Sequence, residues 1–121
     1  MDYKLHAVND PTLEGLWYFE SDALEELREA LSEANLLDEE TPMPPAPPGG
    51  DLAALLAWRS QSSRDPHKVA AWKFKSDAGW LVTPAECALL AQGEIQDDTG
   101  TITAFQSYCR RCISKGGFQI W

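Results

Sequence analysis

The sequence predicts an α+β fold: a single domain with a small, mainly antiparallel sheet and about four helices packed on one of its faces. Three observations support this prediction. Short alternating or aromatic segments, typical of strands, occur near both ends and in the middle of the chain. Segments between them show helical spacing or helix-capping residues. The length of 121 residues fits one domain, so residues 1–121 are assigned to it.

The first two elements are expected to be strands. Residues 3–8 (YKLHAV) alternate moderately and predict a strand, which the turn formers Asn9, Asp10 and Pro11 end. The next segment, residues 15–21 (GLWYFES), is rich in aromatic side chains and is bounded by turn formers. It is expected to be a second strand that forms a hairpin with the first, or a buried loop.

A long amphipathic helix is predicted next, capped by Ser21 or Asp22. Its apolar side chains share one stripe: Leu24, Leu27, Leu31 and Ala34. The opposite face carries four glutamates: Glu25, Glu26, Glu29 and Glu33. Like charges four residues apart destabilise a helix by roughly 0.2–0.5 kcal/mol a pair. Arg28 is the only basic residue in this helix that could offset the repulsion. This face is therefore either an ordinary solvated surface or an acidic recognition face.

A proline-rich connector follows within the same domain. Residues 41–50 (TPMPPAPPGG) contain five prolines, which exclude a helix interior or a central strand. The segment is expected to be an extended linker; the alternative is a docking motif for an aromatic groove. Asp51 is predicted to cap a second helix over residues 52–61.

A second hairpin is predicted in the middle of the chain. Residues 69–75 (VAAWKFK) end in clean alternation, with Trp72 and Phe74 on one side and lysines on the other. Residues 76–79 have the length of a hairpin turn, and residues 80–82 would form the antiparallel partner.

The strongest local signal is the stretch from Thr83 to Glu86 (TPAE). It predicts a capping box, with proline at the first helical position and a helix that ends at Gly93. A last helix is predicted over residues 101–114, and glycines 116 and 117 would end it in the left-handed conformation. The alternation of residues 118–121 (FQIW) predicts a strand that returns to the sheet.

Residues 79–86 (GWLVTPAE) and 116–121 (GGFQIW) together resemble a pattern in small bacterial and phage-borne proteins. In that pattern a hairpin ending in Trp and a Val-Thr-x-x-Glu cap precede two helices and a Gly-Gly-Phe tail. The resemblance covers residues 68–121. It implies that a hairpin, two helices and a closing strand pack as one unit, and it implies no activity and no catalytic residue.

The most chemically suggestive stretch is residues 107–114 (SYCRRCIS). Cys109 and Cys112 both fall on the apolar stripe of the last predicted helix, and free cysteine is often buried. A redox pair would sit at a helix N-terminus, which lowers thiol pKa values, whereas this pair lies later in its helix. A zinc site needs four ligands, and Cys87 with His67 could complete one. Core packing is the leading interpretation, with metal binding and redox chemistry as alternatives.

The charge is unevenly distributed. Residues 1–51 contain 13 acidic and 2 basic residues, whereas residues 52–121 contain 6 acidic and 8 basic residues, within a net charge of −9. Direct binding to nucleic acid is disfavoured, because such binding neutralises phosphates with basic side chains. The polarity instead favours a protein partner with a basic surface, or a homodimer formed front to back.

The leading hypothesis is a non-enzymatic acidic interaction protein, of the inhibitor or immunity type. One specific version is a phage-encoded, anti-CRISPR-like inhibitor that mimics nucleic acid in a host defence complex. The predicted partner-binding residues are the acids and two tryptophans of the first half of the chain: Glu25, Glu26, Glu29, Glu33, Asp38, Glu39, Glu40, Trp17 and Trp58. No cofactor or metal is expected.

The second hypothesis comes from another class. A small metal- or thiol-dependent enzyme would use Cys87, Cys109, Cys112 and His67. A third alternative is a subunit whose acidic face only keeps it soluble. The three cysteines do not suggest a disulfide framework, and no segment resembles a signal peptide or a membrane span. A cytoplasmic location with reduced thiols is therefore expected.

Overall fold

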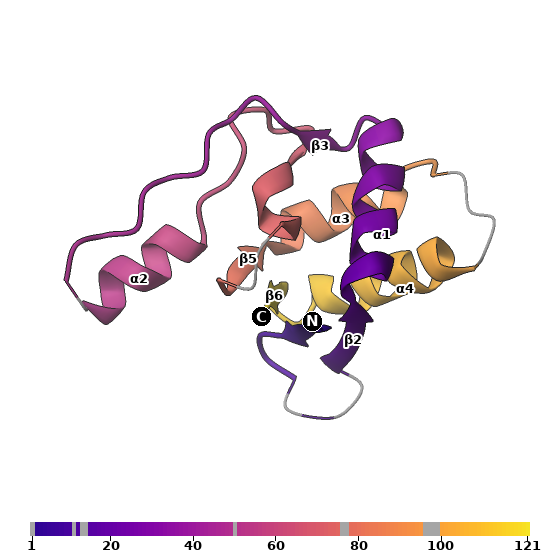
Figure 1. The fold of residues 1–121 in the computed structure, drawn as a ribbon. Coiled ribbons are helices and arrows are strands. Elements are labelled where there is room, and N and C mark those ends of the chain that lie inside the picture. The colour runs from indigo at the N-terminus through magenta and orange to yellow at the C-terminus, as the bar shows by residue number, and fades with distance from the viewer. Residues whose placement is uncertain (1, 11, 13–14, 50, 76–77, 96–99) are drawn as a thin grey trace.

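The computed structural model describes residues 2–10, 12, 15–49, 51–75, 78–95 and 100–121 (Figure 1). Helices and strands alternate along the chain, which confirms the predicted α+β class. In chain order they are β1 (Asp2–Ala7), β2 (Leu16–Glu20), α1 (Ser21–Glu33), β3 (Leu37–Asp38), α2 (Leu52–Arg59), β4 (Val69–Ala70), the 3₁₀ helix η2 (Ala71–Phe74), β5 (Trp80–Val82), α3 (Pro84–Gln92), α4 (Thr101–Ile113) and β6 (Phe118–Ile120).

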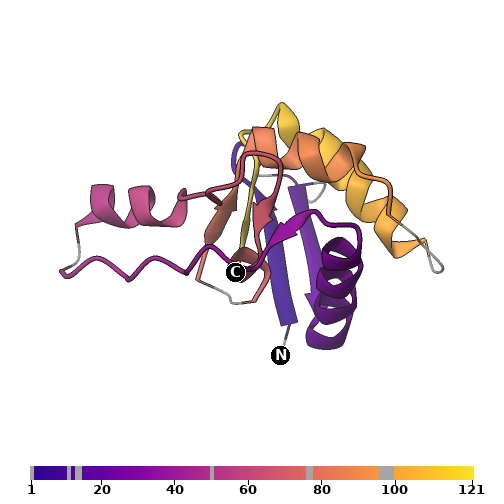
Figure 2. The same cartoon turned by 90° about the horizontal axis from the view of Figure 1, so that it is seen from above.

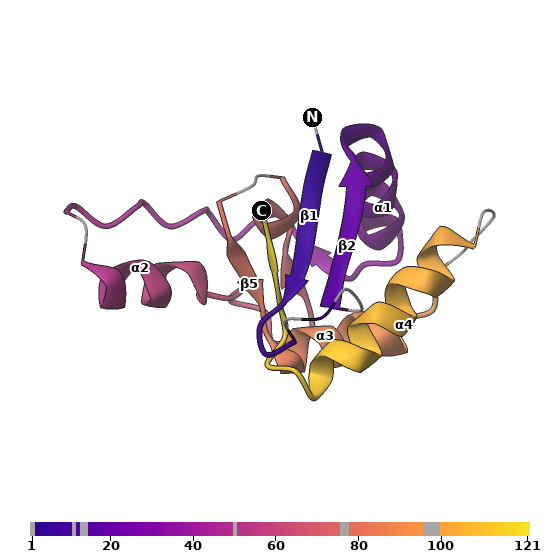
Figure 3. The ribbon, with the colours of Figure 1, turned by 90° about the horizontal axis from the view of Figure 1, so that it is seen from below.

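The main sheet has four antiparallel strands in the order β2-β1-β6-β5. Strands from opposite ends of the chain, β1 and β6, lie side by side at its centre (Figure 3). Leu5 lies opposite Ile120 and Ala7 opposite Phe118, and all four side chains are buried. The strands predicted from alternation near the two ends of the chain are therefore confirmed, and residues 16–20 form the hairpin strand rather than a buried loop. Alternation gives the sheet one apolar face.

Three helices, α1, α3 and α4, pack on that apolar face (Figure 2). Each contributes fully buried side chains to one core, among them Leu24 of α1, Leu90 of α3 and Phe105 of α4. The prediction that all the helices pack on the sheet is wrong for α2, none of whose residues is buried. α2 projects from the body of the protein at the end of the extended proline-rich segment, as an arm (Figure 1).

The predicted hairpin over residues 69–82 is wrong. Within the predicted first strand, residues 69–75, only Val69 and Ala70 form a strand, and they pair in parallel with β3 as a separate two-stranded sheet. Residues 71–74 form η2, and β5 pairs with β6 instead. Helical turns place Lys73 in the interior, fully buried, rather than on a solvated strand face. The predicted turn residues Ser76 and Asp77 lie outside the described residues.

Two of the three predicted helix caps are confirmed. Asp51 accepts a hydrogen bond from the Ala53 amide, and Thr83 with Glu86 forms the complete capping box. The prediction for α1 is wrong, because this helix starts at Ser21 directly after β2, and Glu20 stands at the cap position without a side-chain hydrogen bond. The positive φ angles of Gly116 and Gly117 confirm the left-handed end after α4, and at Gly117 a Cβ would lie 2.1 Å from the Val82 carbonyl oxygen.

Among the described residues, no helix combines the length and the hydrophobicity that crossing a bilayer requires.

Candidate functional site

The solvent face of α1 is the most strongly charged surface that a single element presents. Its five acids are all exposed: Asp22, Glu25, Glu26, Glu29 and Glu33. None of them forms an ion pair within the part of the chain that the structure describes. This face therefore presents uncompensated negative charge to solvent.

The orientation of Arg28 explains why the charge is uncompensated. Arg28 is the only base in α1, and its guanidinium Nη1 donates to the backbone carbonyl of Phe74 at 3.3 Å. This contact turns the side chain toward η2 and away from the glutamates. The buried stripe of Leu24, Leu27 and Leu31 fixes the rotation of the helix. The 3.6-residue period then directs the acids away from the core.

Asp38 does not belong to this exposed surface, so its predicted role in partner binding is corrected. Its side chain is buried at the end of β3. One carboxylate oxygen accepts from the amides of Glu40 and Thr41, and the other accepts from the Thr41 hydroxyl and from Ser63 Oγ at 2.5 Å. These bonds, that of Ser63 first, hold the pKa of Asp38 far below its ordinary value of 3.8. Asp38 therefore joins two loops.

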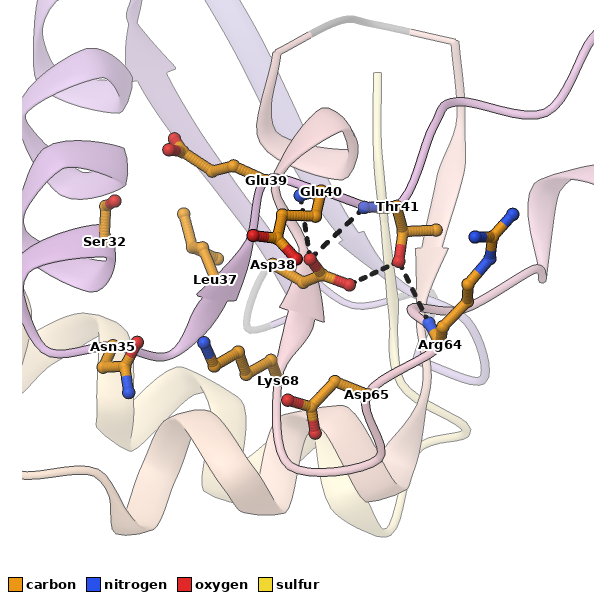
Figure 4. Close-up of a pocket in the computed structure, with 10 residues that line it drawn as sticks. All are labelled: Ser32, Asn35, Leu37, Asp38, Glu39, Glu40, Thr41, Arg64, Asp65 and Lys68. Atoms are coloured by element: carbon orange, nitrogen blue, oxygen red, sulfur yellow. Dashed lines mark hydrogen bonds between the residues drawn. The ribbon is translucent and has the colours of Figure 1, made fainter.

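The loops that Asp38 joins border a polar hollow of about 570 Å³ (Figure 4). Glu39, Glu40 and Asp65 lie on it together with Arg64 and Lys68. Within the described residues neither base forms an ion pair, and the acids outnumber them. Mixed charge in so open a hollow provides no concentrated site for a small ligand. Glu39 and Glu40 are exposed and form a second acidic group, separate from the α1 face.

The two tryptophans proposed as anchors lie in different places. Trp17 is half-buried in β2 and packs on Phe19, Phe105 and Tyr108, with ring centroids 4.7–6.1 Å apart. Trp58 is also half-buried, but it belongs to the α2 arm, which is remote from α1 (Figure 1). Trp17 can therefore contribute to a surface next to α1, and the assignment of Trp58 to that surface is corrected.

The residues of the enzyme hypothesis do not form a reactive site. Cys87, Cys109 and Cys112 are all buried, whereas His67 is exposed on the loop before β4. Burial raises the pKa of Cys112 from 9.0 to about 11, and it raises the pKa of Cys109 further. The thiols of Cys109 and Cys112 therefore remain protonated at neutral pH. In the part of the chain that the structure describes, no three potential metal ligands cluster.

Sequence reasoning missed two features. One is the buried ion pair between Lys73 and Glu86, with Nζ and Oε1 2.7 Å apart. The other is the open edge of β2, where Tyr18 is 65% exposed. A lysine between Trp72 and Phe74 was the available signal for the first feature, and an aromatic strand near an acidic helix was the signal for the second.

Comparisons with protein-family models, curated proteins and solved structures gave no match for this chain.

Proposed function

We propose that this protein is a non-enzymatic binding protein, and that the acidic face of α1 contacts a basic surface of a partner protein. The observation that carries the proposal is the set of exposed α1 acids without ion-pair partners among the described residues. The helix bears this charge at the expense of stability, since Glu25–Glu29 and Glu29–Glu33 are repulsive pairs. A basic partner surface would relieve that repulsion.

The charge of the whole chain supports the same proposal. A net charge of −9 and the concentration of acids in the first half would steer a basic partner toward this side. Electrostatic complementarity of this kind increases association rates and selects partners. We further propose an inhibitory role, in which the carboxylates occupy a surface that otherwise binds nucleic-acid phosphates. The anti-CRISPR-like, phage-encoded version is the narrowest form of this proposal.

The proposal is tested by capture with matched charge variants. The tagged full chain is compared with the double variant Glu26→Gln/Glu29→Gln, which neutralises two acids in the middle of the α1 face. The control Glu39→Gln/Glu40→Gln makes the same change of net charge in the second acidic group. Partners that bind through α1 are expected to be lost by the first variant and kept by the second.

Two results would contradict the proposal. One is equal capture by all three proteins, which would show that α1 is a solvated surface only. The other is an equal loss with both variants, which would show that only net charge matters and that no local face is recognised.

A further inference from the structure

The two edges of the main sheet differ in what they offer to another strand. In an antiparallel sheet, alternate residues direct their backbone N–H and C=O groups to opposite neighbours. The amides of Lys4 and Trp121 each donate to the carbonyl of the other, at 2.7 and 2.8 Å. The backbone groups of Lys4 therefore point toward β6, and those of the residues on either side of it point toward β2. Within β2, Trp17 and Phe19 consequently pair with β1, opposite Leu5 and Tyr3. Leu16 and Tyr18 direct their backbone groups outward, away from the sheet.

The edge formed by β5 is closed. The outward carbonyl of Leu81 accepts a hydrogen bond from Lys73 Nζ at 2.6 Å. The same Nζ is held by Glu86, and Lys73 is fully buried. A buried charge that occupies an edge carbonyl excludes an incoming strand.

The edge formed by β2 is open. In the part of the chain that the structure describes, the backbone groups of Leu16 and Tyr18 have no hydrogen-bond partner. A hollow of about 500 Å³ runs beside this edge, between the start of α1 and the start of α4. Side chains and backbone from these elements line it: Trp17, Phe19, Ala23 and Ala104 are among them. The site thus combines an unpaired strand edge with space for side chains.

The surroundings of this edge are acidic. Glu20 lines the hollow directly, next to Ala23. Glu26 lies one helical turn after Ala23, on the same side of α1. A separate hollow of about 270 Å³ lies at the other end of the same helix, and Glu33 and Glu94 are among the residues that line it. A segment placed on the edge of β2 would therefore lie among carboxylates that have no ion-pair partner within the described residues.

We propose that the open edge of β2 accepts an extended, lysine- or arginine-bearing segment of the partner protein as an additional strand. Backbone hydrogen bonds to Leu16 and Tyr18 would supply affinity, as in other cases of strand addition. Alternate side chains of the segment would enter the hollow beside Trp17, and its basic groups would reach Glu20 and Glu26. This inference rests on the proposed function, and it specifies how the partner docks.

A second copy of this chain is a poorer occupant of the edge. Each copy has a net charge of −9, and pairing of β2 with itself would bring two sets of α1 acids to one interface. Like charges at an interface oppose association. A basic segment has the complementary charge.

The test begins with selection of short random peptides, displayed on phage, against the full chain. Enriched peptides are expected to alternate in hydrophobicity and to carry lysine or arginine. One such peptide is then titrated into isotopically labelled protein, and amide hydrogen exchange is followed by NMR. Binding is expected to slow exchange at Leu16 and Tyr18.

Two substitutions at one position separate backbone pairing from side-chain contact. Tyr18→Pro removes an outward N–H, and proline is tolerated where the N–H of an edge strand faces solvent. Loss of this hydrogen bond is expected to weaken peptide binding by about tenfold. Tyr18→Ala keeps the N–H and is the matched control, with a smaller expected effect. Far-ultraviolet circular dichroism checks that both variants fold.

A measurement on the peptide avoids any effect on folding. Methylation of the peptide's backbone nitrogens, one at a time, is expected to abolish binding at alternate positions and to leave the others unaffected. Equal tolerance at every position would overturn the inference. So would enriched peptides without basic residues, or a dimer of the free protein that Tyr18→Pro dissociates.

The outcomes distinguish the inference from the proposed function. Binding that is weakened by Glu26→Gln/Glu29→Gln but unchanged by Tyr18→Pro and by N-methylation would overturn strand addition and support the acidic face. Binding at the edge that is unchanged by Glu26→Gln/Glu29→Gln would support strand addition and contradict the proposed function.

Discussion

Lys73 Nζ lies 2.7 Å from Glu86 Oε1 in the interior of the domain, where neither side chain has significant solvent access. The same carboxylate oxygen accepts from the Thr83 amide as part of the capping box of α3. One ion pair therefore fixes the start of α3 and closes the edge of β5. Glu86 Oε2 has no hydrogen-bond partner among the described residues, and Lys73 is the only base there that forms an ion pair with this carboxylate.

The first prediction concerns this ion pair. Lys73→Met should lower the free energy of unfolding by about 3–5 kcal/mol, because it leaves the buried carboxylate of Glu86 without a counter-charge. The double variant Lys73→Met/Glu86→Gln should lose less than the single variant, because no uncompensated charge remains. Urea unfolding measures both. A loss below about 1 kcal/mol for Lys73→Met would contradict the burial of this pair.

The second prediction concerns the acidic face of α1. Glu29→Lys should raise the free energy of unfolding at low salt by about 0.5–1 kcal/mol, because it turns two repulsive i,i+4 pairs into attractive ones. The gain should shrink as salt is added. The same substitution should weaken partner binding. Glu39→Lys is the control, since Glu39 lies outside the helix and should show no such gain.

The third prediction concerns the buried thiols. The pKa of Cys112 is raised from 9.0 to about 11, chiefly by burial. The folded protein therefore keeps a proton that the unfolded chain releases, and stability present below pH 9 should fall as the pH rises to about 11. The loss from this thiol is at most about 2–3 kcal/mol, because solvent screening lowers it. Cys112→Ala should flatten the slope of unfolding free energy against pH, and an unchanged slope would contradict the assignment to this residue.

The fourth prediction concerns the α2 arm. Its contacts with the body include the tilted ring contact of Trp58 with Trp80, with centroids 4.4 Å apart. Arg59 adds a hydrogen bond from Nε to the Ala78 carbonyl at 3.1 Å and lies over the Trp121 ring. Leu52 and Leu56 are 66% and 53% exposed. Trp58→Ala should therefore release the arm to limited proteolysis while the urea midpoint of the core changes little. A large shift of that midpoint would show that the arm folds cooperatively with the sheet.

Local signals predicted much of the fold. The capping box at Thr83, the N-cap at Asp51 and the glycines after α4 are each decided by a few neighbouring residues, and all three are confirmed. The leucine stripe of α1 could be predicted from the sequence for the same reason. Such features depend on short-range chemistry, which the sequence displays directly.

Features that depend on distant partners could not be predicted. The alternation at Trp72-Lys73-Phe74 indicated a strand with lysines on one side. The segment instead forms a helical turn, because Lys73 pairs with Glu86 and the preceding residues pair in parallel with β3. Neither partner can be identified from the local sequence. Asp38 was predicted to be a surface acid, because the sequence does not show that Ser63 and Thr41 donate hydrogen bonds to it. The acids of α1 were found by spacing alone, whereas the open edge of β2 required the strand order.

The most direct test of the central claim is the association rate of a captured partner as a function of salt concentration. For the wild type we expect a rate that falls steeply with salt, and for Glu26→Gln/Glu29→Gln a lower rate with a shallower dependence. The control Glu39→Gln/Glu40→Gln should stay close to the wild type. Identical salt dependence in the wild type and the α1 variant would contradict recognition through the acidic face of α1.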